Sequence, residues 1–192
     1  HAARLGADLL GFIFYERSSR YIEPQAARDI AEKIPEAVIK VGVFVNMEGY
    51  RIDEVVSMVG LDAVQIHGDE NDSFPSELRS ETQAQIIKAC RITSDRSTWP
   101  IAETNANYFL LDSYSPEYGG SGRTFDWSIV EGLNGLRERI ILAGGLNADN
   151  VAEAVRIVRP YAVDVASGVE SSPGKKDPKK VAAFIKAAKD AI

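Results

Sequence analysis

Short apolar runs alternate with segments of helical period along the whole chain. Each run is almost continuous in apolar side chains, a pattern typical of strands buried on both faces of a parallel sheet. The segments between them repeat apolar residues at helical spacing. The predicted strands are residues 9–14, 38–45, 63–67, 84–92, 107–112, 139–144 and 161–167. The predicted helices are residues 23–34, 50–59, 74–83, 127–136, 148–159 and 178–192, with Asn147 as the N-cap of the fifth.

This alternation predicts an α/β fold with a parallel sheet. The first residues resemble the end of a helix that stops at Gly6. We therefore expect a TIM (β/α)₈ barrel in which strand 1 is absent from the chain as given and seven parallel strands remain. A doubly wound open sheet is the alternative; the glycine-rich loops described next favour the barrel. Residues 1–192 are expected to form a single barrel domain, incomplete at the N-terminus.

Two glycine-rich loops predict a phosphate site. Gly144 and Gly145 end one predicted strand, and Ser167 and Gly168 end the next. Glycine lets backbone N–H groups approach phosphate oxygens closely, and a short following helix directs its positive end toward them. Either loop alone is read as a tight turn. Two such loops at neighbouring strand ends favour phosphate binding, because this is where barrels of this type hold phosphate.

Four ionisable residues, at strand ends, within a strand and in a loop, are further candidates for the site. Asp112 closes the most apolar strand, where burial favours the protonated carboxyl and suits it to general-acid chemistry, although a capping or salt-bridged aspartate fits equally well. Asp164 lies among apolar residues and is expected to point into the barrel. His67 ends a strand, and Arg20 lies in the loop after the first one. An arginine there is suited to bidentate pairing with a carboxylate or a phosphate.

A long loop and the single cysteine are two further features of the sequence. Residues 118–125 are long and glycine-rich for a connector, which fits either a flexible surface loop or a lid that closes over substrate. Cys90 lies in apolar company and is expected to be a small buried hydrophobe. The predicted lid residues are Gly119, Gly120, Ser121 and Gly122.

Composition narrows the function classes. The net charge is −6 and 45% of residues are hydrophobic, so nucleic acid and anionic membranes are not expected partners. No apolar run approaches the roughly 20 residues that span a bilayer. A single cysteine excludes an intrachain disulfide, and no signal peptide is evident, so we expect a cytoplasmic protein. No metal-ligand cluster or nucleotide fingerprint is present, and no metal or cofactor is expected.

Six segments along the chain have a recognisable sequence: GADLLGFIFYERSSRYI, VGVFVN, AVQIHGDE, LLDSYSPEYGGSGRTFDW, LAGGLNADNV and VDVASGVESSPGKKD. YGGSGRTFDW and DVASGVESSPGKKD are the most specific motifs, and the others are supportive. In this order, the segments resemble the phosphoribosylanthranilate isomerase family of tryptophan biosynthesis.

The resemblance implies an Amadori rearrangement of N-(5-phosphoribosyl)anthranilate to 1-(2-carboxyphenylamino)-1-deoxyribulose 5-phosphate, without a cofactor. It assigns Asp112 as the general acid and Arg20 as the contact for the anthranilate carboxylate. His67 and Asp164 match polar positions of the family's active site, and the two glycine-rich loops match its phosphate site. The family's base is a cysteine in a Lys-Ile-Cys-Gly motif at the end of the first strand. That motif is absent from this chain, and Cys90 does not match it.

The missing base motif keeps two alternatives open. One is a non-catalytic phosphosugar-binding barrel. The other is a sister barrel enzyme, such as indole-glycerol-phosphate synthase or a histidine-pathway isomerase, although the latter is expected to hold two phosphates. The expected partner is a small phosphoribosyl substrate, and the sequence is compatible with a monomer or a homodimer.

Overall fold

A seven-stranded parallel sheet forms the centre of the computed structural model, which describes residues 1–92, 104–113, 124–133 and 135–192. Each strand pairs with the next one along the chain. A doubly wound sheet reverses its strand order part-way, and this sheet does not, so the prediction of an α/β barrel with seven visible strands is confirmed. The strands are β1 (Leu9–Ile13), β2 (Ile39–Phe44), β3 (Ala63–Ile66), β4 (Gln85–Ile92), β5 (Tyr108–Ser113), β6 (Ile140–Leu142) and β7 (Ala162–Val163).

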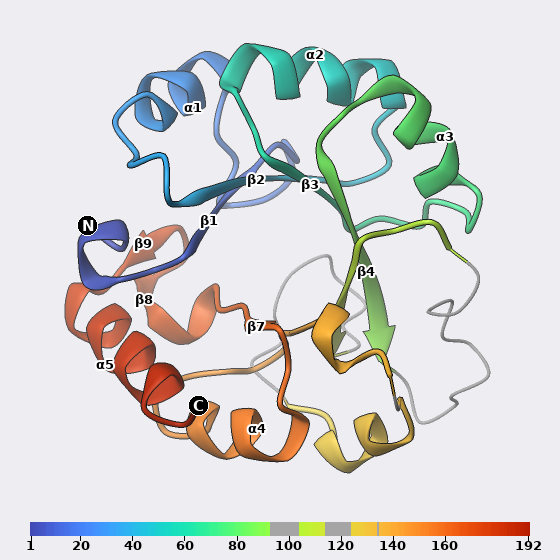
Figure 1. Cartoon of the computed structure of the whole chain (residues 1–192). Helices are drawn as coiled ribbons and strands as arrows, with labels where there is room; N and C mark the ends of the chain where they lie inside the picture. Colours follow the sequence, from blue (N-terminus) through green and yellow to red (C-terminus); the bar gives the residue numbers. More distant parts are fainter. Residues whose placement is uncertain (93–103, 114–123, 134) are drawn as a thin grey trace.

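The helices lie on the outer side of this curved sheet (Figure 1). Proline lies at the first or second helical position of three of them, where its missing N–H costs nothing. None of the described helices is long and apolar enough to cross a bilayer. The helices are α1 (Pro24–Ala31), α2 (Gly49–Val59), α3 (Phe74–Glu81), α4 (Val151–Val158) and α5 (Pro178–Lys189).

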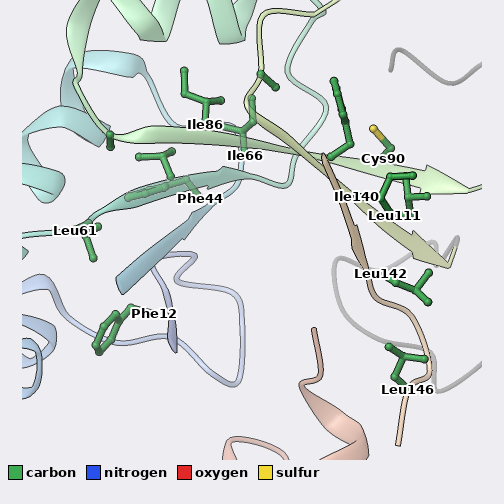
Figure 2. Close-up of a cluster of buried hydrophobic side chains, with 14 of the residues drawn as sticks. Phe12, Phe44, Leu61, Ile66, Ile86, Cys90, Leu111, Ile140, Leu142 and Leu146 are labelled. Atoms are coloured by element: carbon green, nitrogen blue, oxygen red, sulfur yellow. The ribbon is translucent and has the colours of Figure 1, made fainter. Parts of the chain in front are cut away.

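Two apolar layers cover the two faces of the sheet. The larger packs strand residues such as Phe44 and Leu111 against the helices, and part of it is drawn in Figure 2. The smaller draws only on the strands and their ends, with Ala63 and Leu110 among its members, so it fills the concave side. Because strand side chains alternate between faces, every second residue counted from these two also faces the inside of the barrel.

Several predicted elements are shorter than expected. The strand predicted at 161–167 is only β7, which pairs, among the described strands, with the three-residue β6 alone. The helix predicted at 127–136 is wrong: Trp127–Gly132 is a 3₁₀ helix, and Gly135, at φ 87°, cannot continue it.

The predicted N-cap of α4 is also wrong. Asn150, not Asn147, occupies that position. The Asn147 side chain instead accepts a 2.8 Å hydrogen bond from the Asp149 N–H and closes a turn before the helix. This local Asx-type bond competes with an earlier helix start.

A β-hairpin that the sequence did not predict follows β7. Strands β8 (Glu170–Ser172) and β9 (Lys175–Lys176) pair antiparallel around a turn containing Gly174 at φ 80°. A Cβ on Gly174 would lie 2.9 Å from the Ser19 carbonyl oxygen, so the hairpin tip packs on the loop between β1 and α1. The Pro-Gly pair at its tip is typical of a turn, but the prediction from alternating strands and helices did not use it.

A buried ion pair fixes the loops that follow β2 and β3. The Glu70 carboxylate lies 3.3 Å from Lys88 Nζ, and both side chains are 5% exposed. The same carboxylate accepts hydrogen bonds from the backbone N–H groups of Asn46 and Gly68 at 2.8–3.1 Å. Glu70 therefore holds the backbone directly after His67.

We expect Glu70→Ala to lower the free energy of unfolding by about 3–5 kcal/mol, because it leaves the Lys88 ammonium buried without its partner carboxylate. Glu32→Ala is the matched control: it removes an exposed ion pair with Arg28 and should change stability by roughly 0.5 kcal/mol or less. Urea unfolding followed by circular dichroism measures both. Equal losses in the two variants would contradict this assignment of the Glu70–Lys88 pair.

Candidate active site

Three predicted site residues meet on the concave side, at the C-terminal ends of the strands. His67 directly follows β3, Asp112 lies in β5, and Asp164 directly follows β7. Each is in phase with an inward-facing residue two or four positions earlier, since Ala63, Leu110 and Ala162 belong to or pack on the inner apolar layer. The sheet therefore gathers an imidazole and two carboxyls at one rim of the barrel.

His67 and Asp112 approach each other across β4. Their facing atoms, Nε2 and Oδ2, are 3.5 Å apart, and the side chains are 20% and 17% exposed. On β4, the inward-facing residue level with His67 is the small Ala89, and the residue level with Asp112 is Arg91.

Gln65 orients the His67 ring. Its Nε2 lies 2.8 Å from His67 Nδ1. When the amide donates, Nδ1 is the acceptor, and the ring proton of the neutral imidazole resides on Nε2, facing Asp112. This tautomer is assigned from the hydrogen-bond geometry. Gln65 was not predicted as a site residue, although its spacing of two from His67 places both on one face of the strand.

Asp164 lies among protein atoms near the other two groups. Desolvation raises the pKa of its carboxyl, and the negative charge of Asp112 raises it further, while His67 and Lys176 act in the opposite direction. Water still reaches the Asp164 side chain, so this desolvation is incomplete. The expected inward orientation therefore agrees with the phase of the strand, but the residue is more open to solvent than the sequence suggested.

Cys90 takes no part in this site. It is 3% exposed and packs in the outer layer with Leu111 and Ile140, as Figure 2 shows. Desolvation raises the pKa of its thiol to about 12, so almost no thiolate exists near neutral pH. The interpretation of Cys90 as a small buried hydrophobe is confirmed.

The two glycine-rich loops pack against each other and against β5. A Cβ on Gly144, at φ 82°, would lie 2.5 Å from the Ser113 backbone nitrogen, next to Asp112. A Cβ on Gly168 would lie 1.9 Å from the Leu146 carbonyl oxygen. Only glycine allows these approaches. The predicted phosphate loops and the predicted acid therefore lie on the same rim of the barrel.

Backbone donors are available in these loops. Gly144 and Gly145 both have positive φ values, of 82° and 64°. Within the described part of the chain, neither N–H donates to another backbone carbonyl. Ser167 and Gly168 lie in a 3₁₀ helix, Ser167–Val169. Backbone N–H groups without a backbone partner are suited to an anionic oxygen.

Arg20 pairs with a carboxylate of the protein itself. Its Nε and Nη2 each donate a 2.7 Å hydrogen bond to Glu170, whose side chain is 5% exposed. The Arg20 hydrogen bond, assisted by Lys176, lowers the pKa of the Glu170 carboxyl to about 2 against the opposing effect of desolvation. Glu170 was not predicted, because no local pattern reports a contact across 150 positions.

The predicted lid residues, Gly119, Gly120, Ser121 and Gly122, lie outside the described residues.

Fold and rim together define a TIM-barrel-like protein whose ionisable side chains gather at the C-terminal strand ends. The profile of the family described as N-(5′phosphoribosyl)anthranilate (PRA) isomerase matches residues 1–187. The chain belongs to this family. The N-(5′-phosphoribosyl)anthranilate isomerase of Thermotoga petrophila is 48% identical to it over 190 residues, which cover 96% of this chain and 89% of the relative.

Solved structures of the family are also similar. A crystal structure of mutually generated monomers of the dimeric enzyme from Thermotoga maritima has a TM-score of 0.85 at 40% identity. A structure of the isomerase in complex with reduced 1-(o-carboxyphenylamino)-1-deoxyribulose 5-phosphate has a TM-score of 0.83 at 39% identity. Each comparison covers 98% of this chain and 91% of the other.

We predict that Gln65→Leu removes the preference of His67 for one tautomer. In the unaltered protein the ¹⁵N shifts of the ring should report a protonated Nε2, and in the variant a mixture of both tautomers, because the donor to Nδ1 is lost. The chain has two histidines, so a His67→Gln spectrum assigns the signals. A predominantly protonated Nδ1 in the unaltered protein would show that the amide is oriented the other way.

The Glu170 pair also predicts a pH dependence of stability. Its folded pKa, about 2, is below the ordinary value of 4.5, so the pair stabilises the fold fully above pH 4.5. This contribution falls as the pH drops from 4.5 toward 2. The difference in urea midpoint between the unaltered protein and Glu170→Gln should therefore narrow over that range. A difference in urea midpoint that stayed constant over this pH range would contradict the stabilising role of the Glu170 pair.

Proposed function

We propose that this chain carries the chemistry of the phosphoribosylanthranilate isomerase reaction in tryptophan biosynthesis. The substrate is N-(5-phosphoribosyl)anthranilate, and the product is 1-(2-carboxyphenylamino)-1-deoxyribulose 5-phosphate. Family membership over residues 1–187 supports the reaction. The observation that carries the assignment of roles is the placement of Asp112 beside the glycine-rich loops on one rim, where one small ligand reaches both.

Asp112 is the general acid of the proposal. It donates a proton to the furanose ring oxygen, the bond from that oxygen to the anomeric carbon breaks, and the amine lone pair forms the C=N bond of a Schiff base. Its partly buried position limits competition from water. The His67 Nε2–H, 3.5 Å away, stabilises the carboxylate that remains after the transfer.

The second step needs a base for the proton at C2′ of the Schiff base. Removal of this proton gives an enolamine, which tautomerises to the ketone product. Cys90 is excluded by its burial in the outer layer. The family resemblance assigns the base to a cysteine on a strand beside β1. Among the described strands, β1 pairs only with β2, and β7 only with β6, so such a strand fits between β1 and β7.

The two charged ends of the substrate determine the rest of the proposed site. Gly144, Gly145, Ser167 and Gly168 offer backbone N–H groups to the phosphate. Arg20 contacts the anthranilate carboxylate, while His67 and Asp164 contact the sugar between them. A cytoplasmic location and the choice between monomer and homodimer stay predictions.

The competing functions differ in what they do with the same ligand. A phosphosugar-binding barrel binds the reduced product analogue but shows no turnover even when the base strand is supplied. Indole-glycerol-phosphate synthase has a different product, and the family match favours the isomerase. Turnover of N-(5-phosphoribosyl)anthranilate therefore separates the three.

Asp112→Asn should lower kcat by about 10²–10⁴-fold, the usual contribution of a general acid, because the amide cannot donate the proton. Affinity for the reduced product analogue should change by only about threefold, because the side chain keeps its shape. Both quantities are measured in the chain as it stands and in a version preceded by the first strand of the Thermotoga petrophila relative.

Asp29→Asn is the matched control, since Asp29 is exposed on α1. It should leave kcat and affinity unchanged. Full turnover in Asp112→Asn would overturn the role of Asp112. Failure of the unaltered protein to bind the analogue would overturn the proposed function itself.

A further inference from the structure

The Arg20–Glu170 pair joins two loops that are far apart in sequence. Arg20 lies between β1 and α1, and Glu170 opens the hairpin after β7. Two hydrogen bonds of 2.7 Å link them, and the side chains are 20% and 5% exposed. A bidentate guanidinium–carboxylate pair fixes the guanidinium in plane as well as in position.

Glu170 occupies only one edge of the guanidinium. It accepts from Nε and Nη2, the side-on edge. The end-on edge, formed by Nη1 and the second proton of Nη2, has no partner within the described ranges of the chain. A guanidinium has five N–H donors, so a second carboxylate can pair with the end-on edge while the first stays in place.

Positive charge remains after the pair forms. Lys176 Nζ lies 3.1 Å from Glu170 Oε1, and Lys180 Nζ donates a 2.8 Å hydrogen bond to the Glu170 carbonyl oxygen. Arg20 and Lys176 thus contact the Glu170 carboxylate, and Lys180 contacts the backbone carbonyl oxygen of the same residue. In a chain of net charge −6, this is a local positive region suited to an anionic group.

The same contacts link Glu170 to the loop proposed to bind phosphate. Lys176 Nζ also donates to the Ala166 carbonyl oxygen at 2.8 Å, directly before Ser167 and Gly168. The Asp177 N–H donates to the Val169 carbonyl oxygen, also at 2.8 Å, which holds the hairpin on that loop. The open edge of Arg20 is therefore held at a fixed place relative to the phosphate loop.

We propose that Glu170 is a positioning residue that holds the end-on edge of Arg20 toward the carboxylate on the aromatic ring of the substrate. This inference rests on the proposed function and deepens it. Glu170 does not touch substrate; it acts through Arg20 and sets the spacing between the carboxylate and phosphate ends of one ligand.

A purely structural role makes a different prediction. If the pair only ties the hairpin to the β1–α1 loop, loss of Glu170 weakens all ligands of the rim alike. If Glu170 positions Arg20, its loss weakens only a ligand that carries the carboxylate. The ratio of two affinities therefore separates the roles.

Isothermal titration calorimetry with three probes tests the proposal. The probes are reduced 1-(2-carboxyphenylamino)-1-deoxyribulose 5-phosphate, its phenylamino counterpart without the carboxylate, and inorganic phosphate. The unaltered protein should bind the first about tenfold more tightly than the second, as expected for a bidentate charged pair. Glu170→Gln should reduce this ratio to about twofold or less, with phosphate affinity nearly unchanged.

Two further variants keep the test decisive if Glu170→Gln does not fold. Glu170→Asp keeps the charge but shortens the reach to Arg20, and Arg20→Lys keeps the charge but loses the planar fork. Both should reduce the ratio. In the double variant Arg20→Lys/Glu170→Gln, the ratio should fall no further than in Arg20→Lys alone.

Glu70→Gln is the matched control, because it removes a carboxylate from another ion pair with a 5% exposed side chain. It should leave the ratio unchanged even if both affinities fall. An unchanged ratio in Glu170→Gln or Glu170→Asp, or equal losses for both sugar-phosphate ligands, would overturn the positioning role. If the unaltered protein bound neither sugar-phosphate ligand, the proposed function would fail instead.

Discussion

Parallel pairing in chain order is the constraint on which the site depends. Because all strands run in one direction, their C-terminal ends lie on one rim, and residues far apart in sequence meet there. The two-residue period then decides which side chain enters the barrel. Asp112 faces inward, whereas Leu111 packs outward. On β4, Lys88 and Cys90 share the outward phase and serve the scaffold.

Close contacts between backbone segments hold the loops at the rim in place. Gly144 packs on Ser113, Gly168 on Leu146, and Gly174 on Ser19, each at a distance that a Cβ would not allow. These contacts join the end of β5 to the loop after β6, that loop to the one after β7, and the β8–β9 hairpin to the loop after β1. They also explain how Arg20 and Glu170 come to share two hydrogen bonds, since the hairpin tip is already packed on the β1–α1 loop.

The sequence predicted the parts of the fold that local pattern controls. Continuous apolar runs indicated each strand, polar strand ends indicated His67 and Asp112, and the apolar neighbours of Asp164 indicated its inward orientation. The inward partner of His67, Gln65, was readable from its spacing but lacked a chemical signal of its own. Glu170 was not readable, because its importance comes from a tertiary contact. The predictions of an N-cap at Asn147 and of a helix at 127–136 were wrong for local reasons. An Asx-type hydrogen bond forms at Asn147, and a glycine with positive φ follows Trp127–Gly132; hydrophobic periodicity reports neither.

The negative charge of Glu170 weakens the electrostatic attraction of Arg20 for the substrate carboxylate. The entropic cost of binding explains why the pair can still favour the ligand. A free arginine side chain loses rotamer freedom when a ligand fixes it, whereas one already held by Glu170 has lost that freedom during folding. Lys176 and Lys180 restore the positive charge that Glu170 removes. The pair therefore weakens the attraction for an anion but fixes the position of the guanidinium. A fixed position is what a ligand with two charged ends at a set separation requires.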